Sequence, residues 1–248
     1  MEGEYIFEVS KLRALEGRLL STRRLHEMTE LGNEKQMLEL LESEGYEMFP
    51  DFREILAARR RSLLSQLFET VENCPELDVL LTKNDIQNIK TAVKCIVASK
   101  SAEGLFVYPT RIDTEGLLNS IRDGKFDDID EKYSEAAKQG YELICSTGDG
   151  QLFEAFADRT ALALMKEGAE RCGSRMLKDY VTLFIMLCDA KTAFRCAKYG
   201  KSAEFALSAI CGTDGLSKEL LSQAAARGTD EVISLLENSD LKEGAGLL

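Results

Sequence analysis

The chain has 248 residues, with 43 acidic and 31 basic side chains, a formal net charge of -12 and 44% hydrophobic residues. That length suits one large domain or two modest ones, and the apolar content is enough to bury a core. The acidic balance argues against nucleic-acid binding as the main activity, because neutralising phosphates requires clustered Lys and Arg. Three prolines and no tryptophan, with abundant Leu, Ala, Glu and Lys, favour helical structure.

The first hundred residues show apolar side chains at helical spacing. A break at Gly32-Asn33 separates two short helices, and the segment 73–75 ends a long one, because proline cannot continue a helix interior. The predicted helices cover 5–19, 25–31, 37–41, 52–72 and 77–99.

The second half has the same character. Breaks are predicted at Asp123-Gly124, at the glycine-containing turn 146–151 and at Cys172-Gly173. No segment alternates strictly between apolar and polar residues, so no sheet is expected and the predicted fold is all-α. No apolar run reaches the roughly 18 residues of a membrane span, and the acidic start is not typical of a signal peptide. The predicted helices cover 114–121, 127–137, 152–171, 174–199 and, as a short pair, 216–236.

The chain contains an internal repeat. The segment KTAVKC at 90–95 returns as KTAFRC at 191–196, and a Lys-Ser pair follows each copy, so that six of twelve positions are identical at an offset of 101 residues. A duplication predicts two helical units, each a short helix pair followed by a long hairpin, and the opening of a third. The predicted units are 1–104, 105–205 and an incomplete 206–248.

Arg59, Arg60 and Arg61 form the densest basic cluster. Three consecutive helical residues spread over about 200° of the helix, so they cannot all face one ligand. The cluster is either a solvated face that pairs with acids such as Glu54 or a contact to an acidic partner.

Asp85 and Asn88 are polar residues within a predicted long helix. They are three residues apart and therefore share a face. Two roles are open to them, namely bonding a neighbouring helix or loop backbone and contacting a partner.

No catalytic constellation is visible. The single histidine, His26, cannot build a metal site alone, and the turn at 146–150 lacks the spacing of a phosphate-binding loop. The seven cysteines contain no CxxC pair, and a reducing compartment suits them. If the protein were a thiol enzyme, Cys196 beside Arg195 would be the best candidate for its nucleophile. The equivalent Cys95 lies beside Lys94, and this repetition favours a structural role for both cysteines. No cofactor or metal is predicted.

One segment carries a family likeness. The run LLTKNDIQNIK at 80–90 resembles the N-D-x-x-N-[IL] signature of the C-type subunit of A-type/V-type rotary ATPases, the counterpart of the d-type subunit of the eukaryotic vacuolar enzyme. The segments 177–180 and 189–194 are similar to the second hairpin of that family, and the likeness extends from about Tyr5 to Leu236. It implies a funnel of three helical units about a pseudo-threefold axis, of which the third is only begun here.

The resemblance implies a non-catalytic coupler between the central stalk and the membrane rotor ring. The expected partners are the D and F subunits of the central stalk and the ring of proteolipid subunits, at the cytoplasmic face of the membrane, in ATP-driven or ATP-forming transport of protons or sodium. The loops around Gly32, Gly124 and Gly228 join Arg59–Arg61, Asp85 and Asn88 as expected contact regions. The alternative is an all-helical repeat scaffold for protein interaction, although a period of 101 residues far exceeds the ~33 of ankyrin-type repeats.

Overall fold

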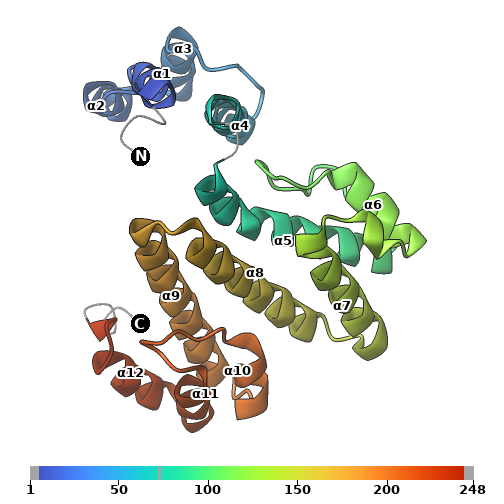
Figure 1. Ribbon diagram of the computed structural model, residues 1–248. Helices are drawn as coiled ribbons and strands as arrows, with labels where there is room; N and C mark the ends of the chain where they lie inside the picture. Colours follow the sequence, from blue (N-terminus) through green and yellow to red (C-terminus); the bar gives the residue numbers. More distant parts are fainter. Residues whose placement is uncertain (1–5, 72–73, 243–248) are drawn as a thin grey trace. The chain divides into compact units, whose positions relative to one another are not determined.

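The computed structural model describes residues 6–71 and 74–242, and it divides the chain into two compact units, 1–74 and 75–248. The described residues are mostly helical and contain no strand, only an isolated antiparallel bridge between Thr213 and Leu216 (Figure 1). The prediction of an all-α fold is therefore confirmed. The predictions that fall on Tyr5, on 72–73 and on the tail after Lys242 lie outside the described residues.

The described part of the N-terminal unit contains four helices, each close to its predicted position. The side chains of Ser21, Asn33 and Asp51 accept hydrogen bonds from backbone N–H groups in the first turns of the last three helices, which fixes where these helices begin. Leu41 and Ile55 are fully buried, whereas the first helix buries none of its residues. The helices are α1 (Ile6–Glu16), α2 (Thr22–Glu30), α3 (Glu34–Ser43) and α4 (Phe52–Thr70).

The C-terminal unit is built on three long helices, α5 (Pro75–Val97), α8 (Gly150–Cys172) and α9 (Arg175–Lys198). Figure 1 shows α8 packed between α5 and α9. Pro75 is the first residue of α5, where its missing N–H is not needed, so this proline starts a helix as well as separating two. Gly173 takes a left-handed conformation between α8 and α9, at the predicted break.

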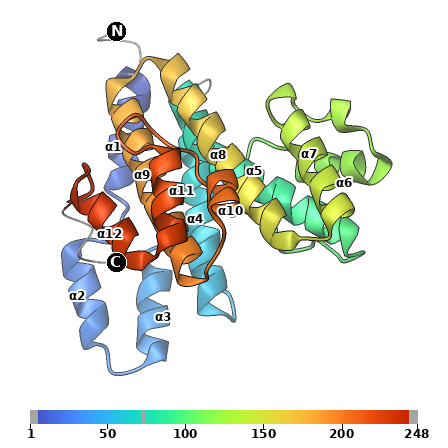
Figure 2. The same ribbon diagram turned by 90° about the horizontal axis from the view of Figure 1, so that it is seen from below.

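Shorter helices flank these three. The helices α6 (Thr114–Asp123) and α7 (Glu131–Thr147) pack on α5, while α11 (Lys218–Arg227) and α12 (Thr229–Glu237) pack on α9 (Figure 2). The predicted helix over 127–137 is corrected: Phe126–Asp128 form a 3-10 turn, and α7 begins only after Asp130, whose side chain caps it. The helix α10 (Ala203–Ala209) was not predicted.

The two copies of the repeated motif end their helices in the same way. The N–H of Lys100 bonds the carbonyl of Cys95 at 2.8 Å, and the N–H of Lys201 bonds the carbonyl of Cys196 at 2.9 Å. Ser99 and Gly200 occupy matching positions with φ of 52° and 61°. The two segments of similar sequence therefore share the same helix end, while the unit boundaries at 104 and 205 stay a prediction.

The close approach of α5 and α8 depends on Gly168, and this yields a test. A Cβ at position 168 would lie 2.7 Å from Cγ2 of Val79, so Gly168→Ala forces a shift of the two helices. We expect this overpacking to lower the free energy of unfolding by about 1–3 kcal/mol. The higher helix propensity of alanine offsets about 1 kcal/mol of that loss. Urea unfolding followed by circular dichroism measures it. In a Val79→Ala background the overpacking disappears, so Gly168→Ala should become neutral or stabilising. An identical effect in both backgrounds would show that the contact is not tight.

Candidate functional site

Asp85 lies in the middle of α5 with 0% of its surface exposed, and it accepts three hydrogen bonds. Oδ1 accepts from the Arg111 N–H at 2.9 Å and from the Thr110 hydroxyl, and Oδ2 accepts from the Tyr133 hydroxyl at 2.6 Å. A buried carboxylate is tolerated only when its oxygens are bonded in this way. The single side chain therefore ties α5 both to the loop that precedes α6 and to α7.

Asn88 holds the same loop one turn further along α5. Its Nδ2 donates to the carbonyl of Val107 at 3.0 Å, and its Oδ1 accepts from the Val107 N–H at 2.8 Å. Asn84 adds a third attachment, donating through Nδ2 to the carbonyl of Pro109 at 2.9 Å. A primary amide can satisfy both backbone groups of one residue, so this loop is fixed without belonging to a helix or sheet.

The surroundings keep the Tyr133 hydroxyl protonated and also shift the pKa of the neighbouring Lys132. Burial, and then the bond to Asp85, raise the pKa of Tyr133 well above its usual value, so its hydroxyl remains a donor at neutral pH. Burial lowers the pKa of Lys132, whose Nζ donates to the Thr82 hydroxyl at 2.8 Å. The cluster is a closed set of satisfied bonds.

Of the two roles that the sequence left open for Asp85 and Asn88, the structure displays the structural one. Both side chains are fully buried and bonded to a loop and a neighbouring helix of their own unit. Direct contact with a partner would first require residues 107–111 to leave. Partner contact by this pair stays a prediction that the geometry does not support.

A second carboxylate repeats this arrangement in α9. Asp189 accepts from the N–H groups of Cys211 at 3.0 Å and Gly212 at 2.7 Å, which lie 101 residues after Thr110 and Arg111. Asp189 itself corresponds to Asn88, and the position of Asp85 is taken by Met186, a buried apolar residue. Burial raises the pKa of Asp189, and the two backbone bonds oppose that rise. Relative to Asp85 on α5, the carboxylate on α9 therefore stands one helical turn later, and it holds the equivalent loop.

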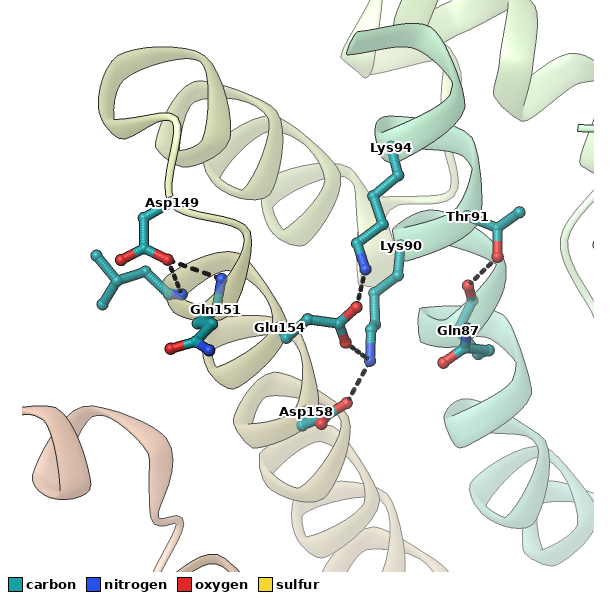
Figure 3. A network of polar contacts seen from close by, with 9 residues as sticks. Gln87, Lys90, Thr91, Lys94, Asp149, Gln151, Glu154 and Asp158 are labelled. Atoms are coloured by element: carbon teal, nitrogen blue, oxygen red, sulfur yellow. Dashed lines mark hydrogen bonds and ion pairs between the residues drawn. The ribbon is translucent and has the colours of Figure 1, made fainter. Parts of the chain in front are cut away.

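A charged cluster joins α5 to α8 (Figure 3). Nζ of Lys90 donates to Oδ1 of Asp158 at 2.7 Å and pairs with Glu154, which also pairs with Lys94. Burial alone would lower the pKa of Lys90, but its bonds to Asp158 and Glu154 outweigh burial and the pKa is raised. Burial alone would raise the pKa of Glu154, but the two lysines outweigh it and the pKa is lowered. Sequence reasoning missed this cluster, although a lysine inside a buried repeated motif was a signal for an acidic partner.

An open groove of about 820 Å³ lies beside this cluster. Polar and charged side chains from α5, α8 and α9 line it, among them Lys94, Glu154 and Arg195, and Lys201 lies at its edge near α10. Cys196 also lines the groove, but burial raises the pKa of its thiol, the opposite of what a nucleophile needs. The thiol-enzyme hypothesis requires a cysteine of lowered pKa, and its best candidate, Cys196, does not meet this requirement.

Comparison with known families decides the identity. The model of the ATP synthase (C/AC39) subunit family matches residues 9–246, nearly the whole chain. The chain belongs to that family. Comparisons with curated proteins and with solved structures gave no match.

Membership confirms the resemblance that rested on the run LLTKNDIQNIK. In this member of the C/AC39 family, the N-D-x-x-N residues of that run are Asn84, Asp85 and Asn88, which are the loop anchors described above. Among its described residues, no helix is long and apolar enough to cross a membrane, and no group of three His, Cys, Asp or Glu could hold a metal ion.

The arginine cluster of this C/AC39 family member divides, as the helical wheel predicts. Arg59 is partly buried: its guanidinium lies 5.1 Å from the centre of the Tyr46 ring and donates to the carbonyl of Arg18 at 3.3 Å. Arg60 and Arg61 are exposed. Only the last two are free to meet a partner, and their role in contact stays a prediction.

Removing one hydroxyl tests the Asp85 anchor. Tyr133→Phe takes a donor from a buried carboxylate, and we expect the free energy of unfolding to fall by about 1–3 kcal/mol, measured by urea denaturation. Tyr199→Phe, at an exposed tyrosine, is the matched control and should change stability by less than about 0.5 kcal/mol. Equal losses in the two variants would contradict the anchor.

The charged cluster has a defined pH dependence. Because the pKa of Glu154 is lowered in the folded chain, its contribution to stability is present above the unfolded pKa of roughly 4.3 and is lost as the pH falls through the lowered folded value. The stability difference between the wild type and Glu154→Gln should therefore be constant from about pH 6 to 8 and shrink in acid. Glu142→Gln, at an exposed carboxylate without an ion pair in the described residues, should show no such dependence. A difference that persists at low pH would rule out the ion pairs as its origin.

Proposed function

We propose that the chain is a non-catalytic coupler in the rotor of an A/V-type ATPase, linking the central stalk to the membrane ring of proteolipid subunits. The observation that carries the proposal is the family match over residues 9–246. On this proposal the chain lies at the cytoplasmic face of the membrane, binds the D and F subunits of the stalk, and takes part in ATP-driven or ATP-forming transport of protons or sodium.

The packing supports a mechanical role. A coupler must pass torque between two partners without yielding, which favours helices joined by buried contacts over helices joined by free loops. Asp85 and Asn88 fix the loop before α6 to α5, and Asp189 fixes the loop before α11 to α9. The ion pairs of Lys90 join α5 to α8 across 68 residues of sequence. Cooperative polar networks of this kind rigidify a helical unit.

The surface charge supports docking through electrostatics. A net charge of -12 favours attraction to a basic patch on the stalk, and such attraction weakens as salt screens it. Arg60 and Arg61, exposed on α4, are the proposed exceptions that meet acidic groups of the partner. The loops around Gly32, Gly124 and Gly228 are the other proposed contact regions.

The family match also weighs against the alternative function. A general helical-repeat scaffold would need many short equal repeats, whereas the matched family covers both long hairpins as one model. The coupler is therefore the function that the observations support best.

Binding to the stalk tests the proposal. We expect the purified chain to form a one-to-one complex with a reconstituted pair of D and F subunits in analytical ultracentrifugation, weakening as salt rises from about 50 to 500 mM. Arg60→Glu with Arg61→Glu should raise Kd by about tenfold, equivalent to about 1.4 kcal/mol. The control is Lys11→Glu with Lys138→Glu, which makes the same change of charge at exposed sites outside the cluster and outside the proposed loops. No complex at the lowest salt would overturn the proposal, and equal effects of the two pairs would remove the arginines from the contact.

A further inference from the structure

A pocket of about 330 Å³ lies between α8 and the loop that joins α10 to α11. Its walls belong entirely to the C-terminal unit. Arg159 and Glu167 of α8 line it together with Lys218, the first residue of α11. Leu164 and Ile210 give it an apolar side. The pocket therefore combines charged groups with a small apolar surface.

Lys218 is held at this pocket by the loop beside it. Asp189 accepts hydrogen bonds from the N–H groups of Cys211 at 3.0 Å and Gly212 at 2.7 Å, which fixes the loop to α9. Gly212 has a φ of 83°, and a Cβ built there would lie 3.1 Å from Cβ of Lys218. Because glycine has no side chain, the lysine stem passes close to the loop backbone. The stem of this half-buried lysine therefore has a defined position.

The two cations of the pocket have no acidic partner in the described part of the chain. Arg159 and Lys218 are both half-buried, and the side chain of neither forms an ion pair or a hydrogen bond with a described residue. Glu167, the carboxylate that lines the pocket, pairs with Arg171 at 3.2 Å. Glu219 accepts a hydrogen bond from the hydroxyl that caps α11. An anion in the pocket would balance two positive charges that are partly removed from water.

The positive charges converge on the thiol of Cys211, which also lines the pocket. Burial, and then the charge of Asp189, raise the pKa of Cys211. Lys166, Arg159 and Lys218 oppose that rise, so the charges of all three act on the same half-buried atom. Because the pKa remains raised, the thiol keeps its proton at neutral pH and does not compete as an anion. Three cations thus gather at this wall in a chain whose net charge is -12.

We propose that this pocket binds the phosphate group of a small phosphate monoester, between the guanidinium of Arg159 and the ammonium of Lys218. A planar guanidinium donates two parallel N–H bonds to phosphate oxygens, and an ammonium adds a point charge. A phosphate monoester carries nearly two negative charges near neutral pH, which matches the two cations, whereas a carboxylate carries one. The apolar body of the ester lies against Leu164 and Ile210.

The volume of the pocket agrees with a ligand of this size. The share of one water molecule in the liquid is about 30 Å³, so 330 Å³ accommodates a phosphate group with a body of several carbon atoms. The proposal rests on the contacts of the C-terminal unit and does not require the rotor-coupling function, so the failure of one proposal leaves the other intact.

Calorimetric titration of the whole chain with butyl phosphate, and separately with inorganic phosphate, tests the site. At about pH 7.5 and about 50 mM salt we expect one-to-one binding with a Kd of about 0.1–1 mM. Butyl phosphate should bind at least about threefold more tightly, because its carbon chain reaches the apolar side. No binding of either compound would overturn the site, including the case in which a carboxylate from elsewhere in the chain fills it. Equal affinities would overturn the contact with the apolar side.

Single substitutions then test the two cations. Arg159→Gln and Lys218→Gln should each raise the Kd by at least about tenfold. Arg227→Gln and Lys138→Gln make the same changes of charge at exposed sites outside the pocket and should leave the Kd unchanged. Equal effects of the two pairs would show that binding follows net charge, and this result would overturn the site.

A carboxylate placed in the pocket provides a second test. Ala163 is an exposed residue of α8 that lines the pocket, and Ala163→Glu should supply a partner for the cations and abolish phosphate binding. Glutamate is a good helix former, so the variant should keep the circular dichroism of the wild type. A folded variant that still binds phosphate would contradict the proposal.

Vesicles that contain phosphatidic acid present the same phosphate group on a membrane. Co-sedimentation that Arg159→Gln abolishes would identify a lipid as the source of the group. Binding of butyl phosphate without co-sedimentation would identify a soluble ester.

Discussion

The C-terminal unit depends on carboxylates placed inside long helices. Asp85 on α5 and Asp189 on α9 each receive backbone N–H groups from the loop that leads to the next short helices. Because an ionised group is stable in the interior only with its bonds complete, each loop must take one path, and the short helices that follow are positioned by it. The paths of these two loops are therefore set by buried polar groups that lie within the apolar core.

The same anchor survives a change of residue position. In α5 the carboxylate stands at 85 and an amide at 88, whereas in α9 a methionine stands at 186 and the carboxylate at 189. A shift of one helical turn keeps a side chain on nearly the same face, so the new carboxylate still reaches the equivalent loop. The loop after each helix is therefore held by a polar side chain, although that side chain differs in type and position between α5 and α9.

The sequence predicted the helices better than it predicted their contacts. Apolar periodicity located most of the helices, and glycine and capping residues located their ends, because these signals are local. The same information did not place α10, nor the start of α7, which depends on the cap at Asp130. The polar residues Asp85 and Asn88 were recognised, but their partners were not. Glu154, Asp158 and residues 107–111 are distant in sequence, and no periodic pattern connects them to α5.

The long sequence separation of the α5–α8 contact has a consequence for synthesis on the ribosome. Lys90 pairs with Asp158, which lies 68 residues later in the sequence. At about 5–20 residues per second, α5 therefore leaves the ribosome roughly 3–14 s before the part of α8 that packs on it. During that interval Val79 and Ile86 present an apolar face to the surrounding solvent, and this nascent helix is the natural client of a chaperone.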